Sequence, residues 1–323
     1  MNKMKRFMSC LLLGCMATST VSFAAVATDE QSTIAVEESV QQDAILDELD
    51  TNLVPVQVTY YNEIEEVLQM REATPQELHK MGISQEEANE IAELDIESAY
   101  YERAQLPESQ LRAYGYTDEQ IAVLKAYDGS KITSDSPVVA AAASCTGSAS
   151  KVSASTSKIA FKYTWTWSSA PVFMRTDKAA VKWKAYNANS VAMDVNCNMS
   201  TTVNYYWLSS GNYNSDKKLS TSLINMNEGC STDVTMQYAK ENNGNADSIW
   251  AKKGTTTVTL TKSSANISYI KFSGSYAHAR ITINGGISVS GDGISISFQP
   301  IGSITTHATV NKKLTSSGTL SNL

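Results

Sequence analysis

The sequence predicts an α+β protein in separate domains, a small N-terminal helical bundle followed by an antiparallel β-sandwich. Apolar residues recur at helical spacing up to about residue 127, and from residue 158 onward they alternate with polar ones. Charge changes with them: residues 28–150 carry 25 Asp/Glu and 6 Lys/Arg, whereas residues 151–323 carry 8 Asp/Glu and 17 Lys/Arg. This asymmetry bears on partners and on how the halves attract each other, not on the fold itself.

The first 27 residues have the layout of a secretory signal peptide. A basic start at residues 3–6 precedes an apolar run at residues 7–14 and a stretch of small residues. We therefore expect an exported protein that is extracellular or associated with the cell wall. A less favoured interpretation is a lipoprotein signal acylated at Cys15. No later stretch approaches the roughly 18 apolar residues of a spanning helix, so no integral membrane segment is expected after signal removal.

The acidic half begins with residues 28–55, which are polar and are expected to be disordered. Residues 56–131 are expected to form a helical domain with two helix-turn-helix repeats. Thr74 and Glu77 make a capping box around Pro75, which starts a helix. A unit of short helix, glycine turn and longer helix then recurs 33 residues later. The matched residues of the two units are Leu78, Met81, Gly82, Ile83, Ser84, Ala88, Ile91 and Leu94 with Leu111, Tyr114, Gly115, Tyr116, Thr117, Ile121, Leu124 and Tyr127.

Two repeats fall short of the three that a solenoid usually needs, so a compact bundle is expected. A helix-turn-helix also suggests DNA binding. The strong negative charge of this half would repel phosphate groups, and no nucleic acid partner is expected.

Residues 132–157 are rich in Ser, Ala, Thr and Gly. Their small side chains and low aromatic content predict a flexible linker that is open to proteolysis.

Residues 158–323 are expected to form the antiparallel β-sandwich domain, with about nine or ten short strands. Residues 159–167 and 179–185 alternate apolar and polar side chains, as half-buried strands do. Near the C-terminus, alternating residues flank Gly291-Asp292-Gly293 and predict a hairpin. Its turn is either residues 291–292 or residues 292–293, and the two choices differ by two in register.

Three cysteines follow the signal peptide. Cys197 and Cys230 both face inward on predicted strands, and export would permit a disulfide between them. Cys145 would then be free. The alternative is that Cys197 and Cys230 are buried thiols that behave as small hydrophobic residues.

Aromatic rings and lysines of the β half are candidate ligand contacts. Rings in polar stretches can stack on sugars, and lysines on an outward face can bind anionic polymers. Single exposed rings and solvated lysines are also common without any ligand. The candidate ligand-binding residues are Tyr206, Tyr213, Trp250, Lys162, Lys182 and Lys184.

Catalysis is the weaker interpretation. His278 is expected on the polar face of its strand, and together with His307 and an Asp it could support acid–base work or zinc binding. However, neither metal-ligand spacing nor a Gly-x-Ser-x-Gly motif occurs in the sequence. We therefore expect no catalytic residues, no metal and no cofactor.

Part of the β half resembles a group of secreted proteins of Gram-positive bacteria that have no assigned activity. The residues that carry the resemblance are the run 163–171, Thr176-Asp177, the run 180–183, and Tyr276-Ala277-His278. The resemblance would cover most of residues 158–323. It implies secretion and brings no catalytic residues to this chain.

Together these features predict a secreted, non-catalytic cell-surface protein whose basic β domain binds an anionic or glycan component of the envelope, such as a cell-wall polymer. The alternative is a pro-protein. In it the acidic helical half would mask a cationic toxin-like or bacteriocin-like β domain until the linker is cut, because opposite charges attract across a tether.

Overall fold

The computed structural model describes residues 61–80, 85–225, 228–279, 287–289, 296–298 and 304–323. The predicted signal peptide, the alternative lipid site Cys15 and the acidic segment 28–55 lie outside these residues. So do the glycine turn of the first helical repeat and the turn of the C-terminal hairpin.

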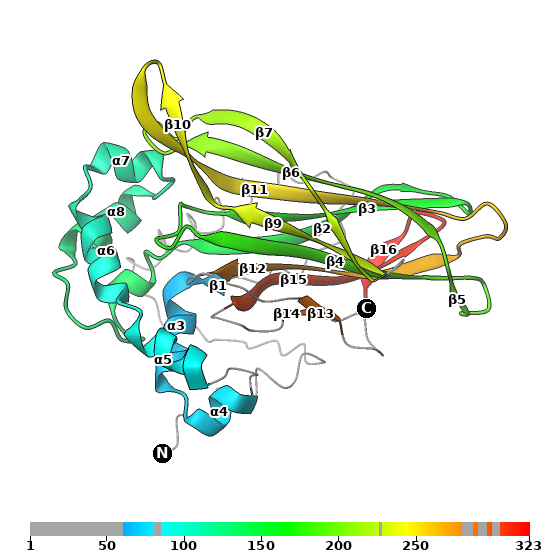
Figure 1. Cartoon of the computed structure of the whole chain (residues 1–323), viewed down its shortest axis with the longest axis horizontal. Helices are drawn as coiled ribbons and strands as arrows, with labels where there is room; N and C mark the ends of the chain where they lie inside the picture. Colours follow the sequence, from blue (N-terminus) through cyan, green and yellow to red (C-terminus); the bar gives the residue numbers. More distant parts are fainter. Residues whose placement is uncertain (1–60, 81–84, 226–227, 280–286, 290–295, 299–303) are drawn as a thin grey trace, which may run out of the picture. The chain divides into compact units, whose positions relative to one another are not determined.

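Two antiparallel sheets make up most of the described chain (Figure 1). The strands of the first sheet, in spatial order, are β1 (Tyr61–Asn62), β2 (Ser144–Ala154), β3 (Lys158–Trp167), β11 (Asn245–Thr261), β6 (Asn196–Trp207) and β7 (Tyr213–Leu219), with β10 (Gln237–Asn242) paired to β11. The strands of the second are β16 (Leu320–Asn322), β15 (Ile304–Thr315), β12 (Tyr269–Ala279), β4 (Thr176–Tyr186), β9 (Gly229–Thr235) and β8 (Ser222–Asn225), with β5 (Ala192–Met193) paired to β4. The prediction of an antiparallel, sandwich-like arrangement is confirmed.

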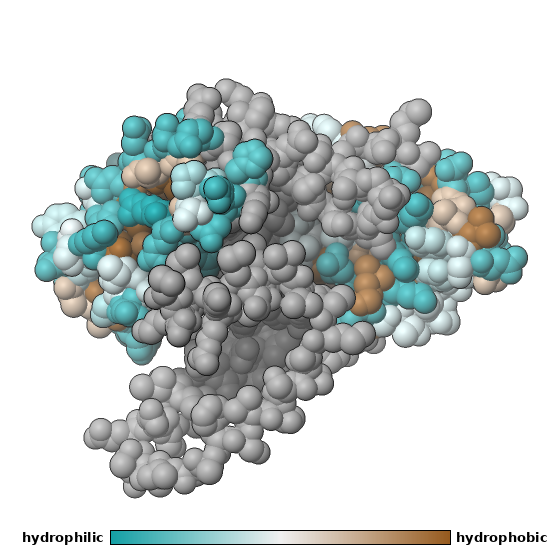
Figure 2. Space-filling model, turned by 90° about the horizontal axis from the view of Figure 1, so that it is seen from below, coloured by the Kyte–Doolittle hydropathy of each residue, from teal (hydrophilic) through white to brown (hydrophobic). Residues whose placement is uncertain are grey.

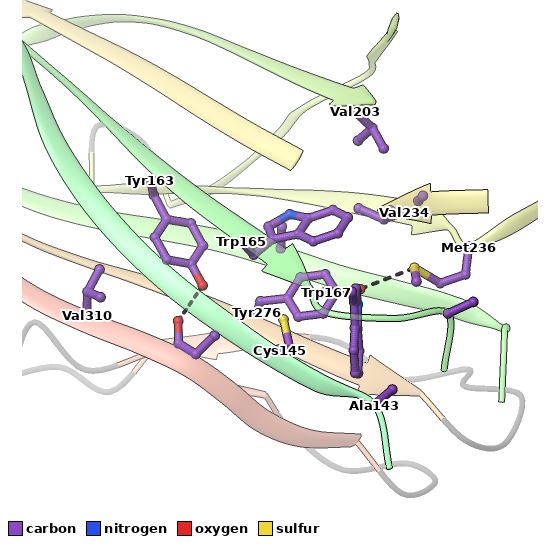
Figure 3. Packing of buried hydrophobic residues seen from close by; sticks show 14 of the residues in the cluster. Ala143, Cys145, Tyr163, Trp165, Trp167, Val203, Val234, Met236, Tyr276 and Val310 are labelled. Atoms are coloured by element: carbon purple, nitrogen blue, oxygen red, sulfur yellow. Dashed lines mark hydrogen bonds between the residues drawn. The ribbon is translucent and has the colours of Figure 1, made fainter. Parts of the chain in front are cut away.

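The core between the sheets is aromatic. The odd residues of β3, from Ile159 to Trp167, are fully buried, as their alternation predicts. Phe161 stacks on Phe272 of β12 with ring centroids 3.9 Å apart, and Trp165 stacks on Tyr276 at 4.3 Å. Figure 3 shows Trp165 and Tyr276 packed between the strands, with Trp167 beside them. Offset-stacked pairs of this kind add to the stabilisation that burial of apolar area provides.

One open side of the sandwich is closed where β2 approaches β15. A Cβ atom on Gly147 would lie 2.0 Å from the Ala308 carbonyl oxygen, so only glycine permits this approach. Ala308 has φ +52° at a bulge in β15, and its carbonyl accepts a hydrogen bond from the Tyr163 hydroxyl. The bulge therefore turns a backbone acceptor toward the core, where a buried tyrosine satisfies it.

In the part of the chain that the structure describes, six short helices lie between β1 and β2: α3 (Glu63–Glu72), α4 (Pro75–Lys80), α5 (Gln85–Glu93), α6 (Ile96–Gln105), α7 (Glu108–Ala113) and α8 (Asp118–Ala126). The Thr74 capping box is present, because the Glu77 carboxylate accepts from the Thr74 N–H at 2.9 Å and the Glu77 N–H donates to the Thr74 hydroxyl at 3.3 Å. Thr117 and Gln120 form the corresponding box of the second repeat. Local capping chemistry was thus predictable from the sequence.

The prediction of a separate helical domain is wrong. Tyr61 of β1 pairs with Cys145 of β2, so the chain enters the first sheet immediately before helix α3. Buried residues of the helices, such as Leu111 and Leu124, belong to the same hydrophobic cluster as Trp167 of the sandwich. Short helices with narrow apolar faces bury too little surface alone, and here they bury it against the sheets.

The prediction of a flexible linker over residues 132–157 is also wrong. Residues 137–139 form a short 3-10 helix, Ala141 to Ala143 are buried, and residues 144–154 form β2, which pairs with β3 along its length and with β1 at one end. The small residues here fill positions where strands and sheet edges approach closely. Composition alone does not distinguish such a packed segment from a flexible one. A protease acting in this region would cut a paired strand, not a free tether.

The C-terminal hairpin is present as a two-stranded sheet of β13 (Ile287–Val289) and β14 (Ile296–Phe298). Ile287 pairs with Phe298 and Val289 with Ile296, which is the register expected for a turn at residues 292–293. Strand β14 packs against β4, β12 and β15 of the second sheet.

The described surface is mainly hydrophilic. On the face shown in Figure 2, hydrophobic residues are scattered among hydrophilic ones at both ends of the view. Every helix in the described ranges is too short or too polar to cross a membrane.

Candidate functional site

A cluster of three ionisable side chains lies fully buried where helix α3 meets strands β4 and β12. Glu63 is the first residue of α3, Asp177 lies on β4 and His278 lies on β12, and none is more than 1% exposed. The His278 Nδ1 atom lies 3.0 Å from Asp177 Oδ2, and its Nε2 atom lies 3.4 Å from Glu63 Oε1. One imidazole is therefore held between two carboxylates from distant parts of the chain.

Backbone and hydroxyl donors surround the Glu63 carboxylate. The N–H groups of Val172 and Phe173 donate to its two oxygens at 2.9 Å each, and the Tyr100 hydroxyl of α6 donates to Oε2 at 3.0 Å. Asn62 caps α3 through its side chain, which accepts from the Ile64 N–H, and this fixes the first turn that carries Glu63.

The Asp177 carboxylate is satisfied in a similar way. It accepts from the Ala279 N–H at 2.9 Å and from the Tyr276 hydroxyl. Trp167 contributes its indole N–H to that hydroxyl at 3.1 Å and packs edge-on against the His278 ring with centroids 4.8 Å apart. Buried charges persist only when they are paired and hydrogen-bonded in this manner.

Electrostatics keep His278 protonated. Burial alone would lower the pKa of the imidazole, but the charge and hydrogen bond of Asp177, together with those of Glu63, raise it to about 10. Burial opposes ionisation of Glu63 as well, yet the contacts with His278 and the two backbone N–H groups lower its pKa below the usual value. The three groups thus form a carboxylate–imidazolium–carboxylate triad.

Arg103 of α6 adds a further positive charge beside this triad. It is 7% exposed, and its guanidinium donates to the Tyr116 hydroxyl at 2.9 Å and to the carbonyls of Ala170 and Pro171 at 2.8 and 3.0 Å. Arg103 and Glu63 both influence the pKa values of Tyr100 and Tyr116, which are raised mainly by burial. The helices and the loop before β4 are therefore joined through buried polar contacts.

The triad is arranged for structural pairing. Both imidazole nitrogens lie against carboxylate oxygens, which leaves neither as a free base or metal ligand in this state. The nearby Cys145 thiol has its pKa raised by burial and by the charge of Asp177, which disfavours the nucleophilic thiolate. Among the residues that the structure describes, no group of three His, Cys, Asp or Glu side chains is placed to hold a metal ion.

The expectation that His278 lies on the solvated face of its strand is wrong. Even-numbered residues of β12, including Phe272 and Tyr276, face the core, and His278 continues that series. The polar ring is tolerated there because Asp177 and Glu63 supply its partners. His307 lies opposite Tyr276 on β15, and His79 is exposed on α4, far along the chain from the triad.

The triad predicts a pH dependence of stability. The pKa of His278 rises on folding from about 6.5 to about 10, so its contribution is complete below pH 6.5 and is lost as pH rises toward 10. Glu63 acts at the acidic end of the pH range, because its lowered pKa gives a contribution to stability that is lost as pH falls below 4.5.

We expect the free energy of unfolding to fall by about 1 kcal/mol more per pH unit between pH 7 and 9.5 in the parent than in His278→Gln. Urea titrations would measure this, with His79→Gln as the control that keeps the parent slope. Equal slopes in parent and His278→Gln would contradict it.

A second candidate site is exposed at the end of the first sheet. We name it the ring–lysine patch, and it is formed by Tyr206, Trp207, Tyr213, Lys217, Tyr238, Lys240 and Lys252. Its most exposed ring is Tyr213, at 54%, which meets Tyr206 edge-on with centroids 5.8 Å apart. Antiparallel pairing of β6 with β7 at Tyr206 and Tyr213 brings these two rings together.

Each lysine of the patch lies over an aromatic ring. The Nζ atoms of Lys217, Lys240 and Lys252 lie 4.2, 5.6 and 5.4 Å from the ring centroids of Tyr238, Trp207 and Tyr206, respectively. These are cation–π distances. Burial acts to raise the pKa of Tyr238, but hydrogen bonds involving Thr235 and Lys217 lower it.

Two carboxylates border the ring–lysine patch, Asp216 beside Tyr213 and Asp247 directly opposite Lys240 on β11. The Tyr213 hydroxyl donates to Asp216 Oδ1 at 2.9 Å, and this hydrogen bond raises the pKa of Tyr213. Asn204 donates to the same oxygen at 2.5 Å. Asp216 therefore orients the exposed ring through its hydroxyl.

The structure brings together only part of the predicted ligand set. Tyr206 and Tyr213 are neighbours, whereas Trp250 is 1% exposed within the core and is excluded from surface binding. Lys162 lies opposite Thr257 on the outer face of the first sheet, while Lys182 and Lys184 lie on β4 of the second sheet. Lys182 is also 4% exposed, so the prediction of an outward, solvated side chain is wrong for it.

Sequence reasoning missed Glu63, Asp177 and the lysines of the ring–lysine patch. Asp177 gave one usable signal, because it occupies an odd, apolar position in the alternating strand 177–185. Glu63 gave no signal in the sequence, because acidic residues are common in the first turn of any helix.

The predicted disulfide is not formed. Cys145, Cys197 and Cys230 are all free thiols, and Cys145 and Cys230 are buried. Burial raises the pKa of Cys230 to about 12. The alternative of a buried, unpaired thiol therefore holds for Cys230, whereas Cys197 is unpaired but only partly buried.

Comparison with known proteins identifies no family. No protein-family model matches the chain, and no curated protein matches it. Among solved structures, one that is similar is AvmM, described as catalysing macrocyclization in alchivemycin A biosynthesis. It is 10% identical, and the match covers 52% of this chain and 87% of that chain with a TM-score of 0.22. A likeness this low carries no argument about activity.

Proposed function

We propose that the protein is a secreted, non-catalytic cell-surface protein that binds an anionic glycan of the cell envelope through the ring–lysine patch. The observation that supports this most is the exposed Tyr213 ring, held beside Tyr206, over whose ring the Lys252 ammonium group lies. A rigid aromatic surface suits the apolar face of a sugar, and lysines suit its acidic substituents. Aromatic anchors of this kind carry much of the binding energy at recognition sites.

The geometry of the lysines supports an acidic ligand over a neutral one. Lys217 donates to the Tyr238 hydroxyl at 3.0 Å and Lys240 donates to Asn214 Oδ1 at 2.8 Å, so both ammonium groups are positioned by neutral oxygens. An ammonium group in such a setting keeps its charge available to an incoming carboxylate. The buried triad, in contrast, has its charges satisfied internally and supports a structural role.

Binding to cell walls and to polygalacturonate, compared with neutral dextran, tests the proposal. We expect Tyr213→Ala to weaken binding to the anionic polymer about five- to tenfold, which corresponds to about 1 to 1.4 kcal/mol. Tyr101→Ala is the matched control, because Tyr101 is also an exposed tyrosine, at 44%, but lies on α6. Lys217→Gln with Lys240→Gln should weaken binding and reduce its dependence on salt. If Tyr213→Ala and Tyr101→Ala bind equally well, the patch is not the glycan site.

A further inference from the structure

Three lysines lie side by side on the outer face of the second sheet. Lys184 of β4 is paired with Lys271 of β12, which is paired in turn with Lys313 of β15. We name these three residues the lysine row. Directly opposed residues in an antiparallel sheet have Cβ atoms about 4.5–5.5 Å apart, and like charges at such positions are destabilising. Repulsion among the three lysines therefore destabilises the folded protein.

Carboxylates do not neutralise the lysine row within the described part of the chain. The ion pairs found there involve other cations. On the β9 side of the row, burial lowers the pKa of the neighbouring Lys182. The negative charge of Glu228 raises that pKa, and the positive charge of Lys184 lowers it. The remaining neighbours in the adjacent positions of β12 and β15, Ser273 and Asn311, are neutral.

A tyrosine pair flanks the lysine row on its other side. Tyr186 and Tyr269 stack on each other with centroids 4.9 Å apart. The Nζ atom of Lys313 lies 4.2 Å from the Tyr269 centroid, and that of Lys271 lies 5.8 Å from the Tyr186 centroid. The rings thus contact each other and the ammonium groups, and the three lysines of the row are partly exposed.

We propose that the lysine row is a second binding site, for a linear phosphate polymer that carries no bases. Neighbouring strands lie about 4.7–4.9 Å apart, so the three ammonium groups form a line across the strands that suits successive charges of an extended polyanion. Single-stranded nucleic acid sites offer open aromatic faces on which bases stack, whereas the two rings here already stack on each other. The site lies on the opposite sheet from the ring–lysine patch and does not depend on the glycan function.

Binding of inorganic polyphosphate to the full chain at several salt concentrations tests this site. We expect the triple variant K184Q/K271Q/K313Q to bind at least about tenfold more weakly. The slope of log Kd against log salt should fall by about two to three, because each lysine–phosphate contact that is removed no longer releases counterions on binding. The free energy of unfolding of this variant should equal or exceed that of the parent, since the repulsion within the row is removed.

The matched control is K158Q/K162Q/K218Q, which removes the same charge from β3 and β7 of the first sheet, outside the ring–lysine patch, and should retain polyphosphate binding. If both triple variants lose affinity equally, general charge explains the binding and the site is refuted. If a single-stranded oligonucleotide with the same number of phosphates binds the row as tightly as polyphosphate does, the assignment to a base-free polymer is wrong. Loss of glycan binding in Tyr213→Ala with polyphosphate binding intact would separate this site from the proposed function.

Discussion

His278→Ala should lower the free energy of unfolding by about 3–5 kcal/mol at pH 6. The imidazolium lies between Asp177 and Glu63, and all three are buried. Removing it leaves two carboxylates close together without their shared cation. The cost is the desolvation of those charges, which greatly exceeds the net value of the intact pair.

Urea unfolding at pH 6 and pH 9.5 would measure this effect. His79→Ala is the control, because His79 is exposed on α4 and should change stability by less than about 0.5 kcal/mol. The penalty of His278→Ala should shrink at pH 9.5, where the parent begins to lose the imidazolium. A loss below about 1 kcal/mol at pH 6 would show that the triad is not a structural element.

A fragment of residues 152–323 should fail to unfold cooperatively, because its first sheet and its hydrophobic core are incomplete. It lacks β1 and most of β2, which separate the β3 edge from solvent. It also lacks Glu63, so the buried His278 loses one of its two carboxylate partners. Exposed strand edges of this kind pair with other chains, so we also expect aggregation.

Circular dichroism and denaturant titration would test the fragment against a chain that begins at Asn52. The longer chain keeps every described strand and helix and should show one cooperative transition. A fragment that unfolds cooperatively, with stability within about 1 kcal/mol of the longer chain, would restore the two-domain interpretation.

Local features were largely predictable from the sequence. Alternation over residues 158–167 and 179–185 identified two central strands, and the Thr74 capping box located the start of a helix. The hairpin pairing was one of two registers left open. These features depend on interactions between residues that are close in sequence, or on a period that a few residues reveal.

The candidate sites were less predictable. Tyr206 and Tyr213 were identified from their polar surroundings, but the lysines that accompany them come from β7, β10 and β11. The lysine row is likewise invisible without the register between β4, β12 and β15. Period-two patterns say which face a residue occupies and not which residue lies beside it on the next strand.

The sequence by itself determined the antiparallel β class, the helix caps and the inward faces of the central strands, because those depend on local spacing. Only the tertiary structure decided that residues 144–154 are a strand and that the helices share the sandwich core. It alone also decided that Glu63, Asp177 and His278 meet. The physical reason is burial: a small residue or a charged one is stable inside a protein only if its distant neighbours fit it, and those neighbours are chosen by the packing of the whole chain.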